Sequence, residues 1–126
     1  MEPDYKGLSE DEIKTSIKNY LEKENWTVQV SWGRNPGIDI DAHRGKEHWI
    51  IEVKGHGSRN PMRVNYFLAV LGELLQKMDN SNAKYSIALP NYEQYRKLWA
   101  KLPQLAKDKT GISCLFVDSN GGITNE

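Results

Sequence analysis

The sequence predicts an α/β fold in which a mixed five-stranded sheet is flanked by helices, in the order α-β-β-β-α-β-α-β. Two observations lead to this prediction. Residues 26–54 alternate polar and apolar side chains with the period of two that is typical of strands, interrupted by turns. From residue 61 onward, helical segments alternate with short apolar runs, and this alternation requires crossover connections and partly parallel strands.

Size and composition restrict the possible classes of protein. The 126 residues suffice for a core, and we expect residues 1–126 to form a single domain. The sequence has no apolar run of about 18 residues, which predicts no contact with a membrane, and the polar start at residues 1–12 is unlike a secretory signal. The one cysteine, Cys114, lies in an apolar run and is expected to be a buried structural thiol. These features favour a cytoplasmic location.

The formal net charge is zero. This value counts against a strongly basic surface for non-specific binding of nucleic acid, but it does not exclude a local basic site.

The first helix is expected to begin after Ser9, which is a suitable N-cap, with Glu12 in position to complete a capping box. It should end near residues 24–25. Its apolar stripe follows the helical period and consists of Ile13, Ile17, Tyr20 and Leu21. Residues 26–32 are predicted to form the first strand.

Residues 38–41 and 49–54 are predicted to pair as an antiparallel hairpin. A two-residue turn at residues 45–46 sets Arg44 opposite Glu47. A four-residue loop gives the same register, whereas a three-residue loop shifts the pairing by one residue and sends the acidic side chains to opposite faces.

In the favoured register Asp39 stands opposite Glu52, with roughly 5 Å between the two Cβ atoms. Two carboxylates this close repel each other unless a cation or the nearby Lys54 compensates their charge. Oxygen ligands of this kind suit Mg²⁺ or Mn²⁺, and Lys54 could stabilise a phosphate or orient an attacking water. Such a group is what metal-assisted phosphodiester hydrolysis needs. An ordinary solvated strand face with ion pairs remains the alternative.

The pattern Pro36…Asp39…Glu52-Val53-Lys54 resembles the motif of the PD-(D/E)xK nuclease superfamily, which has a restriction-endonuclease-like fold. Within it, the chain is most similar to small Mrr-type endonucleases and archaeal Holliday-junction resolvases. The resemblance implies Asp39 and Glu52 as metal ligands, the Val53 carbonyl as a further ligand, and Lys54 as the catalytic lysine. Pro36 departs from the motif, in which the proline directly precedes the aspartate.

Three further residues are weaker candidates for the same site. Asp41 is an acid that the minimal motif does not require. Relatives in the resembled group often supply an acid from the first helix and a glutamine from the helix after the Glu-x-Lys strand, and Glu12 and Gln76 are the best matches. The capping role explains Glu12 at least as well.

Four residues around this motif are candidates for binding nucleic acid: Arg34, His56, Arg59 and Arg63. The glycines near His56 would permit close approach of a ligand. Arg59 and Arg63 flank a helix start, where arginine opposes the helix dipole unless an anion such as a phosphate is nearby. Simple exposure on a loop is the alternative for all four: it explains the arginines as well, and it is the commoner state of a lone histidine in a glycine-rich loop. We expect no catalytic role for His43 or His48.

The second helix is predicted over residues 61–78, with Asn60 as its N-cap. Its apolar stripe consists of Val64, Phe67, Leu68, Leu71, Leu74, Leu75 and Met78. A strand at residues 85–89, a third helix capped by Asn91, and a strand at residues 112–117 complete the predicted elements.

The function expected from these observations and the resemblance is a Mg²⁺-dependent DNA endonuclease or related phosphodiesterase. A homodimer is expected, because cutting both strands requires two sites. Two alternatives stay open: a catalytically idle domain of the same fold that binds nucleic acid or a protein, and a small α/β domain with a structural charge cluster.

Overall fold

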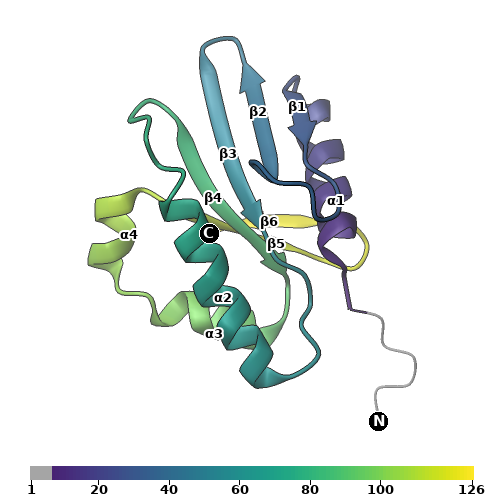
Figure 1. Ribbon diagram of the computed structural model, residues 1–126, viewed down its shortest axis with the longest axis vertical. Coiled ribbons are helices and arrows are strands. Elements are labelled where there is room, and N and C mark those ends of the chain that lie inside the picture. Colours follow the sequence, from purple (N-terminus) through teal and green to yellow (C-terminus); the bar gives the residue numbers. More distant parts are fainter. Residues whose placement is uncertain (1–6) are drawn as a thin grey trace.

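The computed structural model describes residues 7–126, which form six strands and four helices around one mixed sheet (Figure 1). The elements, in chain order, are α1 (Glu10–Lys23), β1 (Thr27–Val30), β2 (Ile40–Arg44), β3 (Glu47–Val53), α2 (Asn60–Leu75), β4 (Lys84–Pro90), α3 (Glu93–Lys101), α4 (Gln104–Thr110), β5 (Ser113–Val117) and β6 (Ile123–Asn125). The expectation that residues 1–12 are no secretory signal falls partly on residues 1–6, which lie outside the described range.

The strands are arranged in the sheet in the same order as in the chain. β1, β2 and β3 form an antiparallel meander, β3, β4 and β5 are parallel, and β6 is antiparallel to β5. The predicted mixed α/β architecture is therefore confirmed, and it is consistent with a restriction-endonuclease-like fold. The prediction of five strands is wrong for residues 7–126, because a turn closed by the Asp118 N–H and the Gly122 carbonyl, 2.8 Å apart, returns the chain along β5.

The central hairpin has the favoured register. Arg44 pairs with Glu47 and Ile40 pairs with Ile51. Extending this register by one residue places Asp39 opposite Glu52. The guanidinium of Arg44 donates to both carboxylate oxygens of Glu47, over 3.0 and 3.2 Å.

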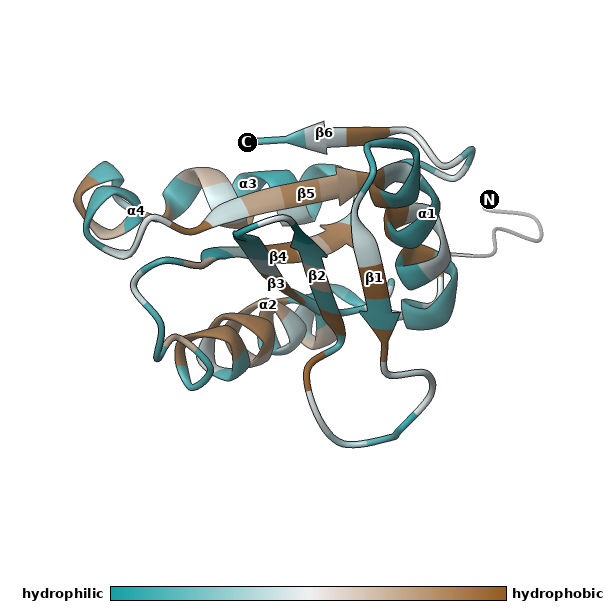
Figure 2. Ribbon diagram, turned by 90° about the horizontal axis from the view of Figure 1, so that it is seen from above, coloured by the Kyte–Doolittle hydropathy of each residue, from teal (hydrophilic) through white to brown (hydrophobic). Residues whose placement is uncertain are grey.

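Helices cover both faces of the sheet, and each face has its own core. α1 packs on one face, where the buried side chains include Ile13, Ile17, Ile40, Ile51 and Leu115. α2 and α3 pack on the other face, where they include Phe67, Leu74, Ile87, Tyr95 and Phe116. Figure 2 shows the apolar residues concentrated on β4, β5 and α2. Within residues 7–126, no helix has the length and apolar character needed to cross a membrane.

Cys114 is fully buried in the second core, as expected for a structural thiol. Its burial raises the pKa of the thiol well above the ordinary value.

The predicted capping box of α1 is present, but the predicted caps of the next two helices are wrong. α2 begins one residue earlier than expected, so that Arg59 is its N-cap and Asn60 its first residue. Tyr92 is the N-cap of α3. The Asn91 side chain instead donates to Asp118 over 2.7 Å, so it links the start of α3 to the turn after β5.

Several side chains of the predicted apolar stripes are exposed. On α2 the buried residues are Phe67, Val70 and Leu74, whereas Leu68 is 61% and Leu75 is 50% exposed. Only a narrow face of this helix contacts the sheet and α3, so the stripe was predicted too wide. On α1, Tyr20 is exposed as well.

Candidate functional site

Asp39 and Glu52 meet where β2 begins and β3 ends. The Asp39 N–H donates to Glu52 Oε2 over 3.0 Å, and the Val53 N–H donates to Asp39 Oδ2 over 2.8 Å. Each carboxylate is thus tied to the neighbouring strand through a backbone amide. Glu52 is 2% exposed, so its charge depends on the protein rather than on solvent.

Lys14 supplies positive charge to Asp39. Its ammonium nitrogen lies 3.5 Å from Asp39 Oδ1 and 3.2 Å from Glu10 Oε2, and it donates to the Ser31 carbonyl. The side chain is fully buried. No motif in the sequence marks this residue; the signal that could have found it is its place next to Ile13 and three positions before Ile17, at the edge of the buried stripe.

Lys77 supplies positive charge to Glu52, with 3.1 Å between its Nζ and Glu52 Oε1. It follows Gln76, the C-cap of α2 and the residue that the resemblance suggested. The pKa of Glu52 is nevertheless raised from its ordinary value. Burial is the largest cause and the negative charge of Asp39 adds to it, while hydrogen bonds from the Asp39 amide and Lys77 oppose it.

Lys54 pairs with α2, and among the described residues it forms no ion pair with Asp39 or Glu52. Its ammonium lies 3.3 Å from Glu73 Oε1 and 5.8 Å from the centre of the Tyr66 ring. It lines a cavity of about 380 Å³ together with the first turns of α1 and α2, Glu10 and His56. The structure therefore gives Lys54 a cavity large enough for a phosphate group.

The oxygen donors around Asp39 and Glu52 suit a hard cation such as Mg²⁺. Each acid already has one oxygen on a backbone amide and the other near a lysine ammonium. These lysines show that the site favours positive charge next to both acids. The donor set fits Mg²⁺ provided that a lysine moves aside.

Two of the three weaker candidates have partners outside this pair, and the third, Gln76, directly precedes Lys77. Glu12 accepts from the Ser9 N–H over 2.9 Å in the capping box, and Glu10, two residues earlier, is the acid that lines the cavity. Asp41 faces the two histidines of the β2–β3 hairpin, described below.

The four candidates for nucleic-acid contacts have different environments. Arg34 and Arg59 are exposed, the first in the loop before β2 and the second at the start of α2. Arg63 donates to the His56 carbonyl over 3.0 Å and lies over the Tyr92 ring, so it holds the loop after β3. His56 lines the cavity beside Lys54.

Gly55 permits close approach of the start of α1. The expectation from the sequence was that a ligand would approach here. A Cβ atom at this position would lie 2.9 Å from the backbone nitrogen of Glu10. The carbonyl of Gly55 also accepts from the Tyr95 hydroxyl over 3.0 Å. The residue therefore lets the end of β3 pack directly against the start of α1.

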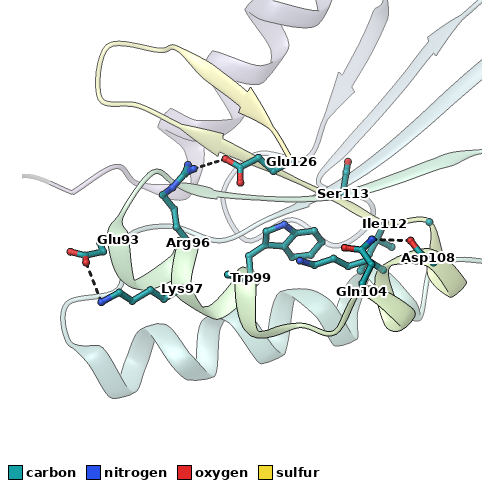
Figure 3. A pocket seen from close by; sticks show the side chains of 12 residues that line it. Glu93, Arg96, Lys97, Trp99, Gln104, Asp108, Ile112, Ser113 and Glu126 are labelled. Atoms are coloured by element: carbon teal, nitrogen blue, oxygen red, sulfur yellow. Dashed lines mark hydrogen bonds and ion pairs between the residues drawn. The ribbon is translucent and has the colours of Figure 1, made fainter.

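A larger cavity, of about 1090 Å³, lies between α3, α4 and the last strands (Figure 3). Four of the charged groups drawn there form two ion pairs, Arg96 with Glu126 over 2.6 Å and Lys97 with Glu93 over 3.1 Å, and Asp108 accepts from the Gln104 amide over 2.8 Å. Its lining includes none of the residues of the motif. Size alone therefore does not make it the functional site.

The structure is an α/β domain whose mixed sheet is consistent with a restriction-endonuclease-like fold. Two solved structures are similar to it: an XisH family protein from Nostoc punctiforme PCC 73102, with a TM-score of 0.61 and 21% identity, and an fdxN element excision controlling factor protein from Anabaena variabilis, with a TM-score of 0.60 and 18% identity. Each similarity covers 89% of this chain and 95% of the other. At such identities the similarity shows the fold alone. No protein-family model and no curated protein matches the chain.

Proposed function

We propose that this protein is a Mg²⁺-dependent phosphodiesterase of the PD-(D/E)xK type that acts on DNA. The observation that supports it best is the pair of acids, Asp39 and Glu52, held side by side at the end of β3 by two backbone hydrogen bonds. Two fixed carboxylates with lysines around them are the arrangement that metal-assisted phosphodiester hydrolysis uses.

In this proposal Asp39, Glu52 and the Val53 carbonyl hold Mg²⁺ (or Mn²⁺), which supplies positive charge to the phosphate and lowers the pKa of a bound water. Lys54 binds the scissile phosphate within the cavity that it lines. Lys14 and Lys77 hold the two acids in position through ion pairs until the metal binds.

The surroundings of the cavity favour an anionic ligand. α2 starts beside it with no side-chain cap and no acidic residue in its first turn, so the positive end of the helix dipole is not offset there. Arg59 at that start and Arg34 in the nearby loop are exposed and would extend the contact along a phosphate backbone. The description of one structural neighbour as an excision controlling factor is compatible with contact to nucleic acid.

A second candidate function is an idle domain of the same fold that binds nucleic acid or a protein partner. The ion pairs of Lys14 with Asp39 and of Lys77 with Glu52 favour it, because they already neutralise both acids. This candidate predicts that no divalent cation binds at the pair.

The two candidates are separated by a calorimetric titration of Mn²⁺ into the wild type, Asp39→Asn and Asp108→Asn. The control changes an acid on α4, away from the site. Mn²⁺ is expected to bind to the wild type and to Asp108→Asn with the same affinity. Its affinity for Asp39→Asn should be at least about tenfold weaker. Equal binding by all three proteins, or binding by none, would leave the idle domain as the better account.

Cleavage is then tested on duplex, junction, flap and single-stranded DNA with Mg²⁺ or Mn²⁺. Lys54→Ala should lower the rate by about 10²–10³ while leaving Mn²⁺ binding nearly unchanged, since Lys54 is proposed to stabilise charge on the phosphate. Lys97→Ala, on the exposed face of α3, is the matched control and should cleave at the wild-type rate. Cleavage by Lys54→Ala at the wild-type rate would refute this role.

A further inference from the structure

Two histidines and an aspartate meet on the β2–β3 hairpin. His43 and His48 are directly opposite each other in the register, and Asp41 is two residues before His43 on the same strand. Because side chains of a strand alternate between its faces, all three lie on one face of the hairpin. Neither histidine was expected to be catalytic, and the sequence alone does not connect them with Asp41.

The ligand atoms of these side chains converge. Asp41 Oδ1 lies 2.6 Å from His48 Nε2 and 3.2 Å from His43 Nε2. The two imidazole rings stack, with their centres 4.1 Å apart and their planes 14° from parallel. Both Nε2 atoms therefore point at the same carboxylate oxygen.

The charged groups around Asp41 differ from those around Asp39 and Glu52, each of which has a lysine ammonium nearby. Among the described residues, the ion-pair partners of Asp41 are the two histidines. Imidazole is neutral in its metal-binding form, so this carboxylate has partners that can share a cation with it.

We propose that Asp41, His43 and His48 form a binding site for a divalent transition metal of the zinc class. Two imidazole nitrogens and one carboxylate oxygen are a ligand set that favours Zn²⁺, Co²⁺ or Ni²⁺ over Mg²⁺. With three protein ligands, the fourth position stays open to water or to a group from a partner.

Two of the three distances between ligand atoms are close to those of a tetrahedral zinc site, and all three ligand atoms lie within 4.8 Å of one another. In a tetrahedral zinc site, ligand atoms about 2.0–2.1 Å from the metal are roughly 3.3 Å from one another. The distance from Asp41 to His43 already has this value, and the distance to His48 must grow by less than about 1 Å. The His43 side chain is 53% exposed, and Figure 1 shows the turn of the hairpin projecting past α2, so solvent has access.

The chain provides its own control, because it has three histidines and the third, His56, lies in the loop after β3. Zn²⁺ is titrated by calorimetry into the untagged full chain and into His43→Ala, His48→Ala and His56→Ala, with circular dichroism to verify folding. The wild type and His56→Ala should bind about one Zn²⁺ with the same Kd, and each hairpin variant should bind at least about tenfold more weakly.

A second measurement on the wild type avoids the risk that a variant fails to fold. In NMR spectra of the imidazole nitrogens, one equivalent of Zn²⁺ should shift the Nε2 signals of His43 and His48 and leave those of His56 in place. Equal shifts of all three histidines, no zinc binding below about 100 µM, or unchanged binding by His48→Ala would each overturn the proposal.

This site is independent of the proposed phosphodiesterase site. Asp39→Asn should keep its zinc binding at the hairpin even if it loses Mn²⁺ binding, and His48→Ala should keep its Mn²⁺ binding. Either site can therefore fail in experiment without affecting the other.

Discussion

Glu52 is a buried carboxylate whose protonation depends on its surroundings. Burial raises its pKa above the ordinary value of 4.5, and the adjacent Asp39 adds to the shift. In the pH range between 4.5 and the raised pKa, the folded protein therefore binds more protons here than the unfolded chain does. By linkage, the contribution of Glu52 to stability is present below that range and is lost as the pH rises through it.

A Glu52→Gln variant tests this sign, because glutamine does not titrate. In buffer with EDTA, the free energy of unfolding of the wild type relative to the variant should fall as the pH rises above about 4.5. Urea denaturation at a series of pH values measures this difference. Glu47→Gln is the control of opposite sign, since the hydrogen bond from Arg44 lowers the pKa of Glu47. A difference that rises with pH for Glu52→Gln would contradict the environment described for this residue.

Lys14 is the second residue whose surroundings determine its effect. Replacing it with methionine keeps the length of the side chain but leaves the Ser31 carbonyl, Glu10 and Asp39 without their shared cation. We expect Lys14→Met to lower the free energy of unfolding by about 1–3 kcal/mol. Lys18→Met, which removes a surface pair with Glu22, should change it by less than about 0.5 kcal/mol. Urea denaturation of both variants checks this, and equal effects would show that burial of Lys14 contributes nothing.

At the scale of elements, the contact between the end of β3 and the start of α1 depends on Gly55. An alanine there meets backbone rather than a flexible side chain, and Gly55→Ala should cost about 1–3 kcal/mol. Gly72 is the matched control, because it lies inside α2 with no atom within 4 Å of its added Cβ. Gly72→Ala should stabilise the protein by about 0.5–1 kcal/mol. Thermal unfolding distinguishes the two directions, and a neutral Gly55→Ala would mean that the start of α1 can shift.

The elements that the sequence predicted well are those determined by local rules. The register of the hairpin follows from turn length and alternation, and the capping box of α1 is a local pattern of Ser9 and Glu12. The caps of α2 and α3 were predicted wrongly because Asn60 and Asn91 are good cap residues in isolation. Where these helices begin is determined by tertiary contacts, such as the hydrogen bond that the Asn91 side chain donates to Asp118.

The same limit applies to the site. Asp39 and Glu52 could be paired from the register, but the partners of each acid come from distant segments: Lys14 from α1 and Lys77 from the residues after α2. A sequence pattern gives no direct signal for such contacts. The ion pair of Lys54 with Glu73 also depends on where α2 packs.

At the scale of the whole molecule, an exposed apolar stripe on α2 is a candidate surface for the homodimer expected from the sequence. Val64, Leu68 and Leu75 lie along one side of this helix and are 36%, 61% and 50% exposed. If two copies pair through this stripe, Leu68→Arg should raise the dimer dissociation constant at least about tenfold. Sedimentation equilibrium measures it, with Leu105→Arg on α4 as the control at an equally exposed leucine. A wild type that stays monomeric at about 1 mM would exclude the dimer.

The one thiol of the chain lies on β5, between β4 and the edge strand β6, in contact with the second core. A thiol-specific reagent can reach Cys114 only when this part of the sheet opens, so the labelling rate reports the free energy of that opening under native conditions. The antiparallel β1–β2 edge lies on the far side of β3 and can open without exposing Cys114. Labelling kinetics compared with urea denaturation would therefore reveal whether the part of the sheet formed by β4, β5 and β6 unfolds as a unit separate from the hairpin.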